Sequence, residues 1–91
     1  MSKKKINSVI IKIRKVLTDS FKGAQTEIKE SETSGKIFGF LIWKRFVGVD
    51  QLKRQQRMWK VLTKKLTRHE QIQISAIFAT TSEERTIVHE S

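Results

Sequence analysis

Nine lysine and arginine residues between positions 44 and 68 have the types and the spacing that bind phosphate groups. Five of them recur at steps of four, three, four and four, which places them in one stripe along a helix. The stretch from Lys53 to Leu66 contains no acidic residue to relieve the repulsion between like charges. A helix that carries this repulsion is a candidate for holding a polyanion. The predicted nucleic-acid-binding residues are Lys44, Arg45, Lys53, Arg54, Arg57, Lys60, Lys64, Lys65 and Arg68.

The alternative interpretation of this stripe is the solvated outer face of an ordinary amphipathic helix. On the opposite side of the same helix, an apolar sector is predicted to hold it to the rest of the fold; its residues are Leu52, Trp59, Leu62 and Leu66, with Gln55 among them and Met58 at its edge. Aromatic side chains can also bind single strands by stacking on bases. We expect Phe38, Phe40, Trp43 and Phe46 to be core residues instead, because a short chain must bury most of its seven aromatic residues.

The net charge of +10 is unevenly distributed along the 91 residues. Residues 1–22 carry +6 and residues 33–69 carry +9, whereas residues 23–32 carry −2 and residues 70–91 carry −3. This asymmetry favours a polyanionic partner, although a generally soluble basic protein is the alternative. The length corresponds to one domain with a modest core.

Other chemistry is not indicated by the sequence. Without cysteine, the chain offers no thiolate nucleophile and no Cys-based metal ligand. Its two histidines, His69 and His89, have no ligand or catalytic spacing to an acidic residue, and we expect His69 at the exit of the long helix. We therefore predict no enzyme activity and no cofactor. No apolar run could span a bilayer, and lysines and arginines interrupt the N-terminal apolar segment, so we predict a cytoplasmic protein without a membrane partner.

The periodicities predict an α+β domain over residues 6–81, with the order α-β-β-α-β and a three-stranded sheet covered by helices on one face. Apolar residues from Ile6 to Phe21 follow a helical period, and Gly23 is a candidate C-terminal cap. The stretches 24–30, 36–46 and 72–80 are predicted strands, and Gly39 indicates a bulge or a close backbone approach. Asp50 caps a helix over 51–66. Residues 1–5 are a basic disordered tail, and residues 82–91 form a polar tail, either a short helical turn or disordered chain.

The segment FVGVDQLKRQQRMWKVLTKKL and its flanks resemble the BolA-like family. The matching features are Phe46, Gly48, Leu52, Arg54, Leu62, Leu66, the strand 72–80 and Thr81-Ser82-Glu83. The resemblance implies a fold similar to a type II KH domain. It also implies nucleic-acid binding in transcriptional or stress regulation, and pairing with a monothiol glutaredoxin around a shared iron–sulfur cluster.

The ligand positions of that family are occupied by other residue types in this chain. Gln55, or Gln56 with a one-residue gap, stands at the helix histidine, and Gln73 stands at the histidine of the last strand. The loop SETSGK supplies neither cysteine nor histidine. Because glutamine is a poor iron ligand, we expect nucleic acid to be the partner. The alternatives are an acidic protein docked on the same helix or on an exposed strand edge, and a monothiol glutaredoxin.

Overall fold

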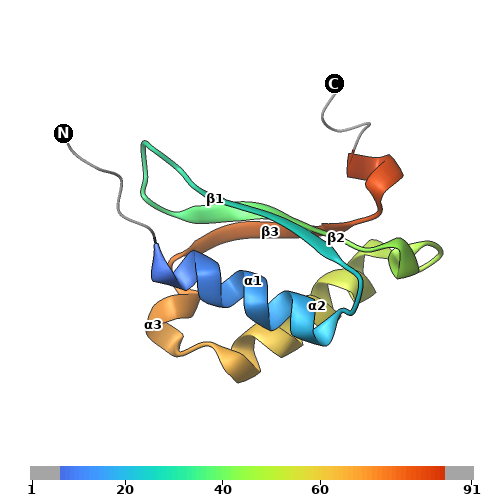
Figure 1. The fold of residues 1–91 in the computed structure, drawn as a ribbon, viewed down its shortest axis with the longest axis horizontal. Helices are drawn as coiled ribbons and strands as arrows, with labels where there is room; N and C mark the ends of the chain where they lie inside the picture. Colours follow the sequence, from blue (N-terminus) through green and yellow to red (C-terminus); the bar gives the residue numbers. More distant parts are fainter. Residues whose placement is uncertain (1–6, 86–91) are drawn as a thin grey trace.

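Residues 7–85 of the chain, as described in a computed structural model, form a three-stranded sheet with the two long helices packed against one of its faces (Figure 1). The helices are α1 (Ser8–Ser20), the 3-10 helix η1 (Lys44–Phe46), α2 (Gln51–Lys65) and α3 (Arg68–Gln71). The strands are β1 (Gln25–Glu30), β2 (Ile37–Ile42) and β3 (Ile74–Thr80). The predicted α+β class and the α-β-β-α-β order are confirmed. The predicted strand 36–46 is too long, because β2 ends at Ile42 and residues 44–46 form η1. The predicted tail 1–5 and positions 86–91 of the predicted polar tail lie outside the described residues.

The sheet has the order β1-β2-β3, with β1 antiparallel and β3 parallel to the central strand β2. Gly39 lies opposite Ile28 in β1, and a Cβ atom built on it would lie 1.9 Å from the Glu27 carbonyl oxygen. The close backbone approach predicted at this glycine is therefore present. A bulge is also present nearby, but in β3. Ser75 is the extra residue, between the β3 partners of Ile37 and Phe38.

The core lies between the sheet and the two long helices. The extra residue in β3 reverses its alternation, so that Ile74 faces the helices together with Ile77. Each element contributes apolar side chains at its own period, 3.6 residues for the helices and two for the strands. The fully buried side chains are Ile13, Leu17, Ile28, Ile37, Leu41, Phe46, Met58, Leu62 and Ile77.

The buried face of α2 differs from the predicted one. Leu52, expected to anchor the helix, is 65% exposed, whereas Arg54 and Met58 are buried together with Leu62. The first turn of α2 reaches the outer edge of β3, where Gln55 bonds to backbone groups of that strand. Because polar backbone groups lie beneath this turn, an arginine and a glutamine face inward there, and Leu52 faces solvent.

The long helix also ends earlier than the sequence suggested. Leu66 has extended backbone angles (φ −102°, ψ 149°), and a new short helix, α3, begins after Thr67. Thr67 and Glu70 form a reciprocal capping box, in which each side chain accepts a hydrogen bond from the backbone N–H of the other residue. Arg68 and His69 therefore belong to α3 and do not continue α2.

Candidate nucleic-acid interface

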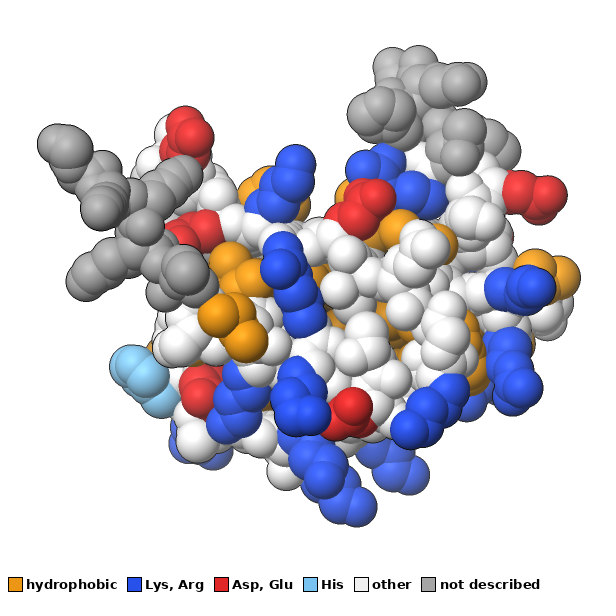
Figure 2. Space-filling model, in the orientation of Figure 1, with side chains coloured by type: hydrophobic (Ala, Val, Ile, Leu, Met, Phe, Trp, Pro, Cys, Tyr) orange, Lys and Arg blue, Asp and Glu red, His pale blue; other side chains and the backbone are white. Residues whose placement is uncertain are grey.

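Six exposed cations of η1 and α2 form what we call the basic surface: Lys44, Arg45, Lys53, Arg57, Lys60 and Lys64. None of them forms an ion pair with an acidic residue of the described chain, residues 7–85. Figure 2 shows Lys and Arg side chains gathered along the lower side of the molecule, where the helices lie. Unpaired positive charge of this kind is available to a polyanion.

The stripe on α2 borders a shallow depression. Lys53, Gln56, Arg57 and Lys60 surround an open hollow of about 450 Å³ on the outer side of the helix. Three cations that converge on one depression can contact the oxygens of a single phosphate or of neighbouring phosphates. The helical spacing that the sequence displays thus yields a concave, positively charged surface.

Arg45 of η1 and Arg57 of α2 lie against the same aromatic ring, that of Trp43. The guanidinium carbon of Arg45 lies 5.8 Å from the centre of the Trp43 ring, and that of Arg57 lies 5.7 Å from it. The indole is itself held in place, since its Nε1 donates a hydrogen bond to the Lys22 carbonyl oxygen at 2.8 Å. The shared aromatic ring therefore links Arg45 to the stripe on α2, and Lys44 is the exposed residue next to Arg45.

Two other predicted binding residues lie away from this surface. Lys65 is exposed beside α1, where it lines a separate hollow with Lys12, Lys15 and Asp19. Arg68 is exposed in the first turn of α3, after the extended residue Leu66 that ends α2. The stripe predicted to reach position 68 therefore ends at Lys64.

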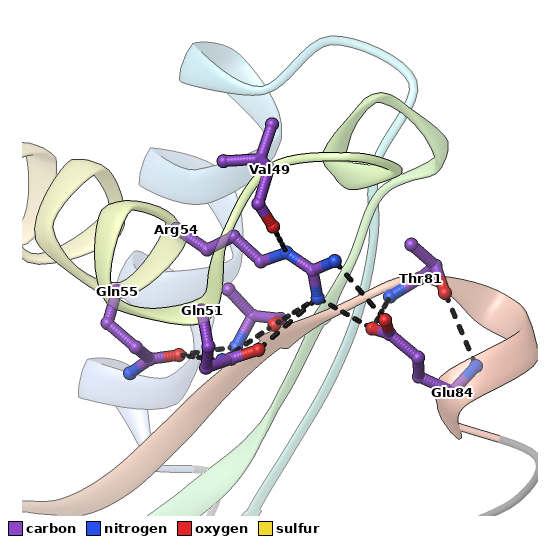
Figure 3. Close-up of polar contacts among 7 residues, drawn as sticks. Val49, Gln51, Arg54, Gln55, Thr81 and Glu84 are labelled. Carbon is purple, nitrogen blue, oxygen red and sulfur yellow. Dashed lines mark hydrogen bonds and ion pairs between the residues drawn. The ribbon is translucent and has the colours of Figure 1, made fainter.

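Arg54 is not part of the exposed basic surface, contrary to its prediction as a binding residue. It is only 5% exposed, and its guanidinium donates to backbone and side-chain oxygens from four segments (Figure 3). The Nε atom donates to the Val49 carbonyl oxygen at 2.7 Å, and Nη1 and Nη2 bond to the Glu84 carboxylate at 2.6 and 3.2 Å. Arg54 therefore joins α2 to the C-terminal segment, and its buried guanidinium is occupied by contacts within the fold.

Glu84 is the partner that the sequence did not identify, because it lies in a segment assigned to a polar tail. Residues 82–85 are helical, and Glu84 and Thr81 cap this turn reciprocally: Glu84 Oε1 accepts from the Thr81 N–H, and Thr81 Oγ1 from the Glu84 N–H. The bond from Arg54 and then the Thr81 N–H hold the pKa of the Glu84 carboxyl below its ordinary value of 4.5. The only sequence signal was the Thr-x-x-Glu spacing, a capping-box pattern.

Acidification is expected to destabilise the fold through two carboxylates. The Thr67 N–H and then Lys12 lower the pKa of Glu70, just as Arg54 and Thr81 lower that of Glu84. A carboxyl with a lowered folded-state pKa stabilises the protein above its unfolded pKa, and this contribution is lost as pH falls through the folded pKa. The urea midpoint should therefore drop as pH falls below about 4.5. The double variant E70Q/E84Q should show a smaller drop.

The control for this prediction is E83Q, which removes a neighbouring negative charge that forms no ion pair within residues 7–85. If the urea midpoint fell equally steeply with pH in wild type and in E70Q/E84Q, Glu70 and Glu84 would not be the source of the acid sensitivity.

Gln55 of α2 and Gln73, just before β3, stand at two of the family's ligand positions, and neither is arranged as a metal ligand. The Gln55 amide bonds to the outer edge of β3: its Oε1 accepts from the Ala79 N–H at 2.7 Å, and its Nε2 donates to the Ile77 carbonyl oxygen at 3.0 Å. The side-chain amide thereby hydrogen-bonds to backbone groups at the edge of β3, as the peptide group of a neighbouring strand would. Gln73 Nε2 donates to the His69 carbonyl oxygen. These residues do not fit an iron–sulfur cluster, and no group of three His, Asp or Glu suited to a metal occurs within residues 7–85.

The predicted aromatic core is only partly correct. Trp43 and Phe46 are buried, but Phe38 and Phe40 lie on the face of the sheet opposite the helices, together with Phe78 of β3. Phe38 is 39% exposed and Phe78 is 50% exposed. This follows from the alternation of β2, in which Ile37 and Leu41 already take the helix-facing positions.

The fold and this surface define a small α+β domain with a cluster of exposed cations on α2 and η1 that have no acidic partner in the described part of the chain. Comparison with protein-family models, with curated protein sequences and with solved structures finds no match for the chain. Among the residues described, no helix is long and apolar enough to cross a membrane.

Proposed function

We propose that this chain is a non-enzymatic nucleic-acid-binding module that contacts phosphates through the basic surface. The observation that carries the proposal is the set of six exposed cations without an acidic partner in residues 7–85. Keeping such cations together costs electrostatic repulsion in the free protein, and phosphates would remove that cost and release counterions. Membership of the BolA-like family, with a role in transcriptional or stress regulation, is part of this proposal and rests on the sequence resemblance.

Charge reversal on α2 tests the proposal. The triple variant K53E/K60E/K64E is expected to bind mixed-sequence nucleic acid about 100-fold more weakly near 0.1 M salt, because each lost phosphate contact removes released counterions. The slope of log affinity against log salt should fall by about 1 per contact. Fluorescence anisotropy over a salt series measures both quantities.

The matched control is K22E/K29E/K36E, which changes the net charge equally at exposed lysines outside the basic surface. Thermal melts must show that both triple variants are folded. Equal losses of affinity in the two variants would mean that overall charge, and not the basic surface, drives binding.

An acidic protein bound to the same cations is the second candidate. Its negative carboxylates would also relieve the repulsion along α2. A pull-down from nuclease-treated lysate separates the two candidates, since capture that survives complete removal of nucleic acid favours a protein partner. For a glutaredoxin partner with a shared cluster, the glutamines at the ligand positions offer no support.

A further inference from the structure

The face of the sheet opposite the helices contains a hollow of about 400 Å³ beside the outer edge of β3. Two of its walls are aromatic rings, from β2 and β3, and the others come from the end of β3, the first residue of α2 and the C-terminal turn. The lining residues are Phe40, Gln51, Phe78, Thr80 and Glu84. This apolar hollow with a few polar groups at its border is built from segments that the basic surface does not use, apart from α2.

One polar atom in this wall lacks a hydrogen bond. Thr80 is 8% exposed, and its Oγ1 is the only buried side-chain nitrogen or oxygen without a hydrogen-bond partner in residues 7–85. Burying a hydroxyl group unpaired is costly, and rotation about χ1 can turn it toward the hollow. A molecule in the hollow that carries a hydrogen-bonding edge would satisfy this group.

The two aromatic rings are not equivalent. Phe40 is already covered, because the guanidinium carbon of Arg85 lies 4.3 Å from its ring centre and Arg85 is held by an ion pair with Glu27. Phe78 lies 5.9 Å from Phe40, centre to centre, and keeps half of its surface exposed. Its ring is therefore the one that a planar ligand can stack on.

We propose that this hollow binds one unpaired base of a single-stranded nucleic acid, stacked on Phe78 with its polar edge toward Thr80. The inference rests on the proposed function and adds a preference for single strands, because the bases of a duplex are stacked and paired and cannot present a free face. Gln51 lines the hollow and Lys53 borders the depression of the basic surface, so the first turn of α2 contributes a residue to each site, on opposite sides of the helix. A single strand that passes around this turn can place its phosphates on the basic surface and one base in the hollow.

The test compares a short mixed-sequence single strand with a blunt duplex of the same sequence. F78A should bind the single strand roughly 5- to 100-fold more weakly and the duplex as wild type does, since stacking on an aromatic ring is lost only for unpaired bases. T80V, which keeps the shape and removes the hydroxyl, should lose single-strand affinity by a few-fold and should be at least as stable as wild type. I72A is the control, because Ile72 is 60% exposed and does not line the hollow.

A second variant covers the case in which F78A does not fold. F78W keeps the stacking surface, and its added fluorescence, measured against wild type, should be quenched by the single strand and not by the duplex. Single-strand binding by F78A equal to that by I72A, or absence of quenching in F78W, would overturn the inference. If the inference failed in this way but K53E/K60E/K64E still lost affinity for both the single strand and the duplex, the proposed function would stand without the base-binding hollow. Failure of wild type to bind either nucleic acid would refute both.

Discussion

Replacing Gly39 by alanine is expected to destabilise the fold by about 3 kcal/mol or more. The new Cβ would lie 1.9 Å from the Glu27 carbonyl oxygen and 2.9 Å from the Ile28 Cα atom, so backbone, and not a flexible side chain, would have to move. Moving it would separate β1 from the central strand. Because a domain of this size is stable by only about 5–10 kcal/mol, much of the variant should be unfolded in low urea, as equilibrium denaturation followed by circular dichroism would show.

The matched control is G23A, the same chemical change at a glycine with nothing within 4 Å of the new Cβ. Gly23 has a φ of 87°, so its substitution costs about 1–2 kcal/mol of backbone strain alone. If G39A were no more destabilising than G23A, the strands would not be packed as closely at Gly39 as the structure shows.

Replacing Arg54 by methionine is expected to cost about 3 kcal/mol of stability. Methionine retains much of the apolar stem but leaves the Val49 carbonyl oxygen without its donor and releases Glu84. The Glu84 side chain is 45% exposed and can be rehydrated, so the loss comes mainly from the buried carbonyl groups and from the contact with Phe46. Urea denaturation measures the change.

K53M is the control for this prediction, since Lys53 is the neighbouring residue on α2 but is exposed and unpaired within residues 7–85. It should alter stability by less than about 0.5 kcal/mol. The affinities should show the reverse order: folded R54M should bind nucleic acid nearly as wild type does, and K53M should bind less tightly. A loss of affinity in R54M as large as in K53M would mean that Arg54 reaches the ligand.

Local sequence patterns predicted the structure correctly where the types and short spacing of residues decide it. The apolar spacing of α1 places Ile13 and Leu17 in the core, and Asp50 caps α2 by accepting the Leu52 N–H. The alternation of β1 correctly buries Ile28. The cations Lys53, Arg57, Lys60 and Lys64 are exposed, as their helical spacing indicates.

Helical periodicity does not determine which side of α2 meets the sheet at each turn. Hydropathy alone would bury Leu52 and expose Arg54. The structure has the reverse, with the leucine exposed and the arginine buried. A helix that passes over a strand edge meets unpaired N–H and C=O groups, and there hydrogen-bonding capacity outweighs apolar area. The Glu84 partner lies 30 residues away, so no local pattern could have paired it with Arg54.

By itself, the sequence determined the order of the main helices and strands, the α+β class and the row of cations, because these follow from residue types at short spacing. Only the tertiary structure decided that the row ends at Lys64, that Arg45 joins Arg57 around Trp43, and that Phe78 lies open on the sheet. Those outcomes depend on how the elements are docked and on a one-residue bulge at Ser75, which sets the direction of every later side chain in β3.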